Sequence, residues 1–288
     1  MSRWPRQILF GDVDAMYASS AIVADPSLAG KLVAVGSPPP RGIITAASYP
    51  VRRFGVAAAM PTGQALRLCP DLILVPPDRP LYERLHQQLR EVTDRFFPLY
   101  AWTSIDEFYT ETTDLQSLHP DPIVLGRTVK EAIFEATGLR CTVAIATSKA
   151  VAKVAVDAHK PDGLAVIEPG TEAAFLAPRP VQSLPGIGPK TADDLERLGI
   201  HRISALMEPR FEPLLRRLLK EYPECATAGP ARILLGRREL RAGRTGEAVA
   251  LFRAASGPEA ARGLVGAAIQ REAWDEIPPL LDALDPAD

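Results

Sequence analysis

Two pairs of acidic residues stand at positions where their carboxylates could form one site. Asp12 and Asp14 follow the apolar run of residues 7–10, and Asp106 and Glu107 are adjacent in a segment with a strand-like pattern. Carboxylate oxygens bind hard divalent cations, and a cation held beside a phosphorylated substrate can catalyse phosphoryl transfer. Adjacent strand residues point to opposite faces of a sheet, so Asp106 and Glu107 can both ligate a metal only if the backbone bends there. Together with Asp12 they would supply an oxygen cage suited to two Mg²⁺ ions.

Both pairs are also compatible with roles that involve no such metal site. An Asp-x-Asp pair can be solvated or can cap a helix, and Asp106 and Glu107 can be surface residues of an exposed strand. Phosphatases of the haloacid dehalogenase type also begin with an apolar strand and Asp-x-Asp. The residues that follow are usually small and hydroxyl-bearing there, whereas this chain has Ala15, Met16 and Tyr17. The residues alone therefore indicate a divalent-metal site that handles phosphate, without selecting one enzyme class.

An irregular alternation of strands and helices would have to position these carboxylates. Apolar runs and alternating stretches predict strands, and apolar residues at helical spacing predict amphipathic helices. Between residues 31 and 46, two short strands flank a proline-rich loop, which predicts a small separate lobe. The whole pattern predicts an α+β fold. Strands are expected at residues 7–14, 102–110 and 140–146, and helices at 15–24, 81–96, 124–136 and 149–159.

The chain changes character after residue 184. Residues 185–191 form a glycine-bearing loop that opens a helix, and the free amide groups at such a helix N-terminus can bind a phosphate. Residues 222–230 have the composition of a linker. Beyond them, residues 241–252 align with 270–281 at an offset of 29, and both copies predict a helix, a turn and a helix. This pattern is similar to degenerate tetratricopeptide repeats, although a plain helical cap accounts for it equally well.

Length and composition limit the class of protein. The 288 residues predict two or three domains, and the 47% hydrophobic and 24% charged fractions are typical of soluble globular domains. The net charge of −2 argues against tight, sequence-independent binding to DNA. Because no apolar stretch approaches the roughly 20 residues that cross a membrane, and because the start of the chain lacks a secretory signal, we expect a cytoplasmic protein without membrane contact. The three cysteines are widely spaced and support neither a disulfide framework nor a zinc site.

A series of short motifs, taken in order, resembles the Y-family translesion DNA polymerases of the DNA polymerase IV type. Each motif alone is weak, but their combined order is highly specific, and the resemblance covers roughly residues 6–206. The motifs lie at residues 10–19, 46–56, 59–61, 68–70, 104–107, 152–153, 160–163 and 184–188.

The resemblance implies a right-hand polymerase fold of the α+β class with a short all-α C-terminal segment. Residues 1–19 and 78–168 would form the catalytic palm, and residues 20–77 a small fingers lobe. Residues 169–229 would form a helical thumb with a helix-hairpin-helix. Residues 230–288 would be a helical, tetratricopeptide-like tail in place of the little-finger domain that usually grips DNA. We therefore expect weak processivity.

The resemblance also assigns site residues. Asp12, Asp106 and Glu107 would be catalytic and would hold two Mg²⁺ ions, which Mn²⁺ could replace, with the backbone carbonyl of Val13 as an extra ligand; Asp14 would be structural. The other assigned groups bind the triphosphate, exclude a ribose 2′-hydroxyl as a steric gate, lie near the templating base or hold a DNA phosphate. They are Tyr49, Arg52 and Lys160 for the triphosphate, Tyr17 for the gate, Ile43 and Thr45 for the templating base, and Gly186, Ile187, Gly188 and Lys190 for DNA. Without these roles, Arg52 and Lys160 are ordinary surface cations and Tyr17 is a core residue.

The expected activity is template-directed DNA synthesis of the translesion type, with primer-template DNA and deoxynucleoside triphosphates as partners. Residues 231–288 could recruit a protein partner. The alternative is a catalytically inactive or accessory relative that serves as a scaffold in DNA damage tolerance. Metal-dependent nucleotide binding distinguishes the two hypotheses, because a scaffold should show none.

Overall fold

The computed structural model describes residues 4–207, 211–221, 223–224, 228–256, 258–271, 273 and 276. The chain divides into two compact units, Met1–Phe175 and Leu176–Asp288. Within the described residues, no helix is long and apolar enough to cross a membrane.

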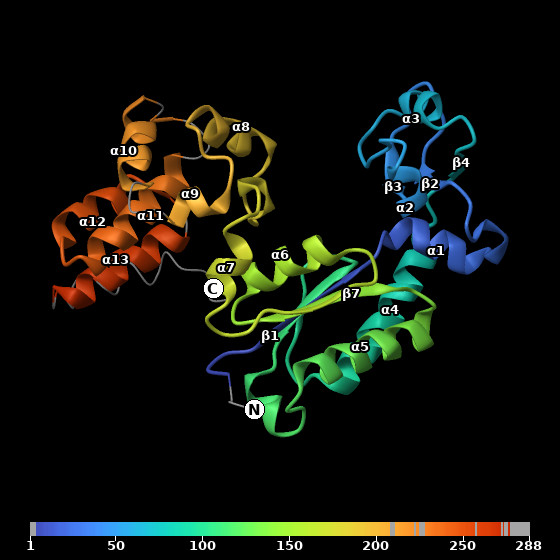
Figure 1. Ribbon diagram of the computed structural model, residues 1–288, viewed down its shortest axis with the longest axis horizontal. Helices are drawn as coiled ribbons and strands as arrows, with labels where there is room; N and C mark the ends of the chain where they lie inside the picture. The colour runs from blue at the N-terminus through green and yellow to red at the C-terminus, as the bar shows by residue number, and fades with distance from the viewer. Residues whose placement is uncertain are drawn as a thin grey trace. The chain divides into compact units, whose positions relative to one another are not determined.

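A five-stranded sheet forms the centre of the first unit (Figure 1). Its central strand, β1 (Ile8–Val13), pairs antiparallel with β6 and β7, and its residues are buried on both faces. A continuous apolar run is typical of a strand that is covered on both sides. The order is β5-β6-β1-β7-β8, with β5 at Ala101–Trp102, β6 at Glu107–Glu111, β7 at Cys141–Ala146 and β8 at Leu164–Val166. The strand β8 was not expected from the sequence.

Helices cover both faces of this sheet. α4 (Arg79–Phe96) and α5 (Pro122–Thr137) lie on one face and α6 (Lys149–His159) on the other (Figure 1). The Asp78 carboxylate caps α4 by accepting a hydrogen bond from the Leu81 amide at 3.0 Å. A 3-10 turn, η2, occupies Thr113–Ser117 between β6 and α5. The predicted helices and the strands at 7–14 and 140–146 are thus confirmed within a few residues.

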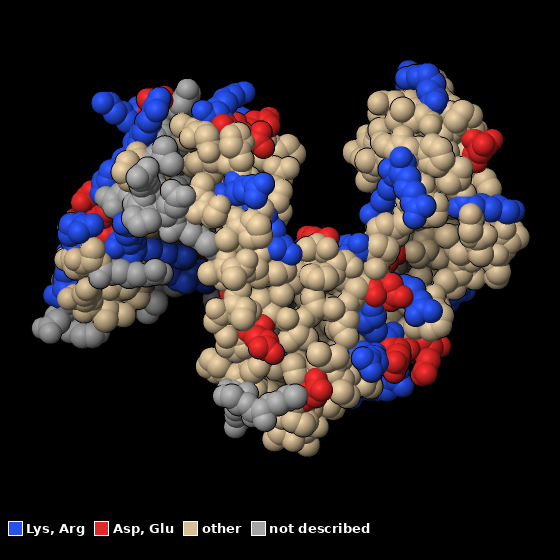
Figure 2. All heavy atoms as spheres, viewed as in Figure 1, with Lys and Arg blue, Asp and Glu red and all other residues tan. Residues whose placement is uncertain are grey.

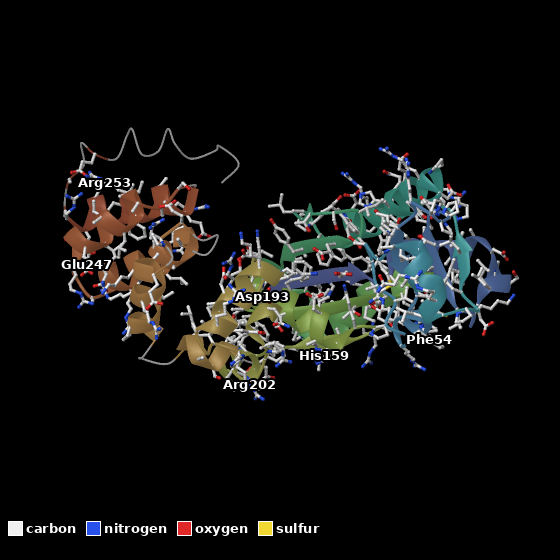
Figure 3. The ribbon with its side chains drawn as sticks, turned by 90° about the horizontal axis from the view of Figure 1, so that it is seen from above. Phe54, His159, Asp193, Arg202, Glu247 and Arg253 are labelled. Atoms are coloured by element: carbon white, nitrogen blue, oxygen red, sulfur yellow. The ribbon has the colours of Figure 1, made fainter. Side chains whose placement is uncertain are left out.

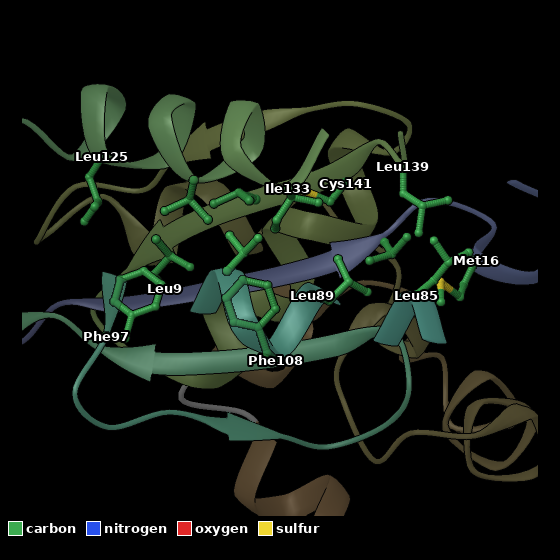
Figure 4. Close-up of a cluster of buried hydrophobic side chains, with 14 of the residues drawn as sticks. Leu9, Met16, Leu85, Leu89, Phe97, Phe108, Leu125, Ile133, Leu139 and Cys141 are labelled. Carbon is green, nitrogen blue, oxygen red and sulfur yellow. The ribbon is translucent and has the colours of Figure 1, made fainter. Parts of the chain in front are cut away.

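Alternate residues of β1 face different helices. Leu9 and Val13 pack into the large apolar core with α4 and α5 (Figure 4). Gly11 lies on the same face, and a Cβ there would overlap the buried ring of Phe108. By the two-residue period of a strand, Asp12 therefore faces the side that carries α6.

The predicted small lobe is present in the first unit. It has a three-stranded sheet in the order β3-β2-β4, with β2 antiparallel to β3 and parallel to β4. Its buried core is separate from the core under the main sheet, and Phe54 is exposed at its surface (Figure 3). The elements are α1 (Met16–Ala24), η1 (Pro26–Leu28), β2 (Val33–Gly36), β3 (Ile44–Ala47), α2 (Tyr49–Arg52), α3 (Thr62–Leu68) and β4 (Ile73–Val75).

In its described residues, the second unit consists of helices joined by turns and loops, with one isolated β-bridge between Pro180 and Arg202. The buried residues Val181, Leu195 and Ile200 form the core of its first part. The elements from residue 172 onward are α7 (Glu172–Leu176), η3 (Val181–Ser183), α8 (Pro189–Arg197), α9 (Ile203–Met207), α10 (Phe211–Glu221), α11 (Ala228–Arg241), α12 (Thr245–Arg253) and α13 (Pro258–Gln270).

The helices at the end of this unit pack closely around one aromatic ring. Phe252 of α12 is fully buried, and its ring fills the space beside Gly236 of α11 and Gly263 of α13. The predicted repeat at 241–252 corresponds to the end of α11, a turn and α12. Its second copy, residues 270–281, lies mostly outside the described residues.

Two sequence expectations need correction. Residues 228–230 belong to α11 and not to a linker, because a proline in the first turn of a helix breaks no hydrogen bond. Residues 102–110 form two strands and not one. β5 ends at Trp102, β6 begins at Glu107, and a bend occupies residues 103–106, as a metal site that uses both Asp106 and Glu107 would require.

Candidate active site

Asp12 lies near the end of β1 and is almost completely buried, with 2% of its surface exposed. Two ammonium groups contact its carboxylate. Lys160 Nζ lies 2.5 Å and Lys153 Nζ 3.1 Å from Asp12 Oδ2. Because a buried charge is costly without a partner, these two lysines make the buried carboxylate tolerable.

Glu107 is directly opposite Asp12 in the pairing of β1 with β6. Lys153 also contacts the Glu107 carboxylate, so one ammonium group joins the two acids. Asp157, one helical turn after Lys153, lies 3.3 Å from that ammonium and 3.6 Å from Lys160 Nζ. The site therefore contains three carboxylates and two lysines in one network.

The pKa values in this network shift in line with the contacts. Burial raises the pKa of Asp12, and the two lysines only partly offset this effect. For Lys153, burial lowers the pKa, but the hydrogen bond to Glu107 and the charges of Asp12 and Asp157 more than reverse it, so the net shift is upward. Lys153 is therefore fully charged at neutral pH.

Asp106 is positioned by the bend before β6. Its carbonyl accepts a hydrogen bond from the Val13 amide at 2.9 Å, which joins the bend to the end of β1. The Ser104 hydroxyl donates to Asp106 Oδ1 at 2.5 Å and accepts from the Glu107 amide at 3.1 Å. Ser104 thus fixes the bend that separates the two acids.

Asp14 is buried and accepts hydrogen bonds from three segments of the chain. Its Oδ1 accepts from the hydroxyls of Tyr49 at 3.2 Å and Thr142 at 3.0 Å, and its Oδ2 accepts from the Asp162 amide at 2.7 Å. Burial raises the pKa of Asp14, although these hydrogen bonds act in the opposite direction. Asp14 therefore holds α2 and the loop after α6 against the end of β1.

The turn from β1 into α1 determines the direction of Tyr17. Ala15 adopts a left-handed conformation with φ 48°, which is strained for a residue with a Cβ and is typical of functional sites. The Tyr17 ring then packs on Tyr82 of α4, with ring centroids 4.5 Å apart.

The predicted triphosphate residues come from two elements. Arg52 stacks over the Tyr49 ring, 4.3 Å from its centroid, and donates to the Ala47 carbonyl at 2.9 Å. Lys160 caps the C-terminal end of α6, directly after His159 (Figure 3).

Most of the predicted site residues line one pocket of about 590 Å³ between the main sheet and the small lobe. Ala15 is also part of the pocket wall. Two predicted site residues of this unit are not in the wall. Ile43 is 52% exposed, and Glu107 contacts Lys153. The predicted residues in the wall are Asp12, Val13, Tyr17, Thr45, Tyr49, Arg52, Asp106 and Lys160.

The donor set suits a hard divalent cation. Asp12, Glu107 and Asp106 offer carboxylate oxygens, the ligand type that Mg²⁺ prefers. Asp12 and Glu107 already share one cation, the Lys153 ammonium. In the described part of the chain, no three acidic, histidine or cysteine side chains converge on one point. Before all three acids can ligate a metal, the metal must therefore compete with Lys153 at both acids and with Lys160 at Asp12, and Asp106 must turn from Ser104.

The predicted DNA-binding loop lies in the second unit. Gly188 is the N-cap of α8, Gly186 has a φ of 89°, and Lys190 is exposed. Ile187 packs against the local core and so anchors the loop. The amide groups at the start of α8 and the Lys190 ammonium are suited to bind a phosphate.

Lys153 was not expected in the site, although the Ala152-Lys153 pair was part of the motif series. A signal was present, because Lys153 stands between the buried residues 151–152 and 154–156 of α6. A lysine at such a position needs an acidic partner.

Two protein-family profiles match the chain. A profile of the impB/mucB/samB family matches residues 11–157, which include the small lobe, most of the main sheet, and Asp12, Asp14, Asp106, Glu107 and Asp157. A second profile, the IMS family HHH motif, matches residues 169–200 and so includes the predicted helix-hairpin-helix.

Two curated relatives are both named DNA polymerase IV. The chain is 39% identical over 222 residues to DNA polymerase IV of Methanoculleus marisnigri, an alignment that covers 76% of this chain and 61% of the relative. It is 39% identical over 211 residues to DNA polymerase IV of Gluconobacter oxydans, with 73% and 59% covered. The chain thus spans about three fifths of the length of these relatives.

Two solved polymerase structures are similar to this chain in fold. The insertion ternary complex of Dbh DNA polymerase and the crystal structure of DinB from Sulfolobus solfataricus each match with a TM-score of 0.67 and 30% identity, covering 74% of this chain and 62% of theirs. The sequence matches, the fold and the order of the motifs agree, and the chain therefore belongs to the impB/mucB/samB family, the DinB type of Y-family DNA polymerases.

Proposed function

We propose that this protein is a template-directed DNA polymerase of the translesion type, which adds deoxynucleotides to a primer 3′-hydroxyl. One observation carries the proposal. Acidic, cationic and aromatic residues from separate segments line a single pocket: Asp12, Asp106, Lys160, Arg52, Tyr49 and Tyr17.

In this proposal Asp12, Asp106, Glu107 and the Val13 carbonyl hold two divalent ions, Mg²⁺ or Mn²⁺. Bound there, the ions would activate the primer hydroxyl and neutralise charge on the leaving pyrophosphate. Burial of Asp12 keeps water away from one ligand, which strengthens its interaction with any cation. The Ser104 hydroxyl bonds to the Asp106 carboxylate and to the Glu107 amide, and so holds the bend from which both acids would reach the ions.

The remaining pocket residues bind and select the nucleotide. Arg52 and Lys160 supply positive charge for the triphosphate, and Tyr49 supplies a hydroxyl donor. The Tyr17 ring, backed by Tyr82, would lie under the sugar and exclude a ribose 2′-hydroxyl. Thr45 lines the pocket and would lie near the templating base, whereas Ile43 is exposed outside the lining and has less support for this role.

DNA contacts would come from the second unit. Gly186, Ile187, Gly188 and Lys190 would hold a backbone phosphate without reading bases. Residues 228–271 contain eight arginines and three glutamates, and basic side chains are abundant on the face of this unit seen in Figure 2. Residues 272–288 add six acidic residues and no Lys or Arg, so attraction of DNA phosphates to this segment would be local.

Several finer expectations belong to the same proposal. The palm would comprise residues 1–19 and 78–168, the fingers 20–77, the thumb 169–229 and a helical tail 230–288. Weak processivity, a protein partner for residues 231–288 and a cytoplasmic location stay predictions. The inactive scaffold has less support, because the relatives compared above are named as polymerases.

Extension of a labelled primer on an undamaged template tests the proposal. Purified protein with Mg²⁺ or Mn²⁺ should extend the primer, and Asp106→Ala should abolish extension. Glu91→Ala, an exposed acid on α4, is the matched control and should extend normally. Absence of extension with either metal, at high protein and low salt, would contradict an autonomous polymerase.

A further inference from the structure

Lys153 lies in a row of charged residues along α6, one turn after Lys149 and one turn before Asp157, beside the buried apolar residues of the helix. The neighbouring residues Val151, Ala152, Val154, Ala155 and Val156 are buried, while 21% of the Lys153 side chain is exposed. Its ammonium contacts Asp12 and Glu107, two of the three acids proposed to hold metal ions. The ammonium therefore stands where a metal would have to bind.

The same ammonium has a third acidic partner outside the pair. Asp157 lies one turn along α6, at an Nζ–Oδ1 distance of 3.3 Å, and 49% of its side chain is exposed. An (i, i+4) Lys–Asp pair needs only a side-chain rotation to form or strengthen. Lys153 can thus leave Asp12 and Glu107 without losing an acidic partner.

Electrostatic repulsion gives a reason for the Lys153 ammonium to lie at Asp12 and Glu107 without a metal, and at Asp157 with one. Two carboxylates that face each other across β1 and β6 repel, and one is deeply buried, so they need a cation when no metal is bound. A divalent ion and an ammonium group at the same carboxylates repel each other, so one must move away when the other binds.

We propose that Lys153 is a positioning residue that substitutes for the metal, holding Asp12 and Glu107 in place until a divalent ion displaces it toward Asp157. The inference rests on the proposed function insofar as Asp12 and Glu107 are metal ligands. It adds a competing cation built into the chain, which lowers metal affinity but keeps the ligands assembled.

Metal binding without nucleotide or DNA tests this role. Isothermal titration of the full chain with Mn²⁺ should show about tenfold tighter binding for Lys153→Met than for wild type, because the competing cation is gone. Lys149→Met is the matched control. Lys149 lies one turn earlier on α6 and is exposed against the Tyr109 ring, so its removal should leave Mn²⁺ affinity unchanged.

Thermal unfolding supplies an independent readout. In EDTA, Lys153→Met should unfold at a lower temperature than wild type, because Asp12 and Glu107 lose a shared cation. Saturating Mn²⁺ should raise the unfolding temperature of Lys153→Met by more than it raises that of wild type. Equal losses with and without Mn²⁺ would mean that Lys153 serves only folding, and would overturn the proposal.

Substitution of Asp157 tests whether Lys153 moves toward this residue when a metal binds. Asp157→Asn should weaken Mn²⁺ binding in the wild-type background, where Lys153 needs a second partner, and should have a smaller effect in Lys153→Met. Equal effects in the two backgrounds would overturn the displacement to Asp157.

These outcomes are separate from the primer-extension test. If wild type binds Mn²⁺ as described but extends no primer, the polymerase proposal fails and the role of Lys153 stands. If wild type extends primers but Lys153→Met binds Mn²⁺ no more tightly, the role of Lys153 fails and the polymerase proposal stands.

Discussion

Asp14 shows how one buried carboxylate can position groups that are far apart in the sequence. It accepts hydrogen bonds from Tyr49, Thr142 and the Asp162 amide. Tyr49 lies three residues before Arg52, and Asp162 lies two residues after Lys160. The hydrogen bonds of Asp14 therefore hold both sources of the proposed triphosphate charge beside the pocket.

Replacement of Asp14 separates the loss of its hydrogen bonds from the loss of its charge. Asp14→Ala leaves a buried amide and two hydroxyls without their acceptor, so we expect a loss of roughly 2–4 kcal/mol in the free energy of unfolding and a higher KM for nucleotide. Asp14→Asn should lose about 1 kcal/mol or less, because the Tyr49 and Thr142 hydroxyls can rotate to accept from its amide group. Denaturant titration measures the difference, and equal losses in the two variants would contradict the importance of these hydrogen bonds.

Tyr17 carries the proposed discrimination between sugars. Tyr17→Ala removes the ring that packs on Tyr82 and opens the floor of the pocket, so we expect at least tenfold more incorporation of ribonucleotides relative to deoxynucleotides. Single-nucleotide extension with the two substrates gives the ratio. Tyr109→Ala replaces another half-buried tyrosine, which lies in β6 outside the pocket lining, and should leave the ratio unchanged.

At the scale of elements, β1 has the apolar core on one face and the proposed metal ligand Asp12 on the other. Its two faces carry different residue types because Leu9, Gly11 and Val13 face α4 and α5, while Asp12 faces α6. A register shift of one residue would move Asp12 into the apolar core. The close packing of Phe108 on Gly11 disfavours such a shift.

Gly11→Ala tests this packing. The added methyl group must displace the fully buried Phe108 ring or the strand, so we expect a loss of roughly 1–3 kcal/mol in stability. Gly63 in α3 is the control, because a Cβ there meets only Arg67 at 3.9 Å. Gly63→Ala should be neutral or stabilising by up to about 1 kcal/mol. Thermal unfolding measures the stability of both variants. A Gly11→Ala variant as stable as wild type would argue against the close packing of the Phe108 ring on Gly11.

At the scale of the whole molecule, the chain has two compact units with separate cores. The first unit holds the pocket. The second holds the loop proposed to bind a DNA phosphate and a bundle in which Phe252 is buried between two glycines. Cores that share no side chains can lose stability independently.

Phe252→Ala tests this independence. We expect it to destabilise the second unit by roughly 3–5 kcal/mol, because the cavity is enclosed by α11 and α13. Hydrogen exchange should become faster in α11, α12 and α13, with no change in β1 or β7. Burial raises the pKa of the Cys141 thiol in β7 to about 12, so Cys141 should also stay unreactive toward alkylating reagents. Faster alkylation of Cys141 in this variant would show that the two units unfold together.

The sequence by itself predicted the main helices and strands and most of the residues that line the pocket. Local hydrophobic period predicted β1, α4, α5, β7 and α6, because burial on one or two faces leaves a repeating pattern. The motif order identified Asp12, Asp106 and the residues around Tyr49, because chemistry restricts residue type at each position.

Tertiary structure decided what depends on contacts between distant segments. The bend before Glu107 arises from a hydrogen bond with Ser104 and from pairing with β1, and neither leaves a periodic pattern. The short β8 forms because β7 offers it an edge. Lys153 gains its role only where α6 crosses the ends of β1 and β6, since a lysine becomes a counter-ion through the acids that folding places beside it.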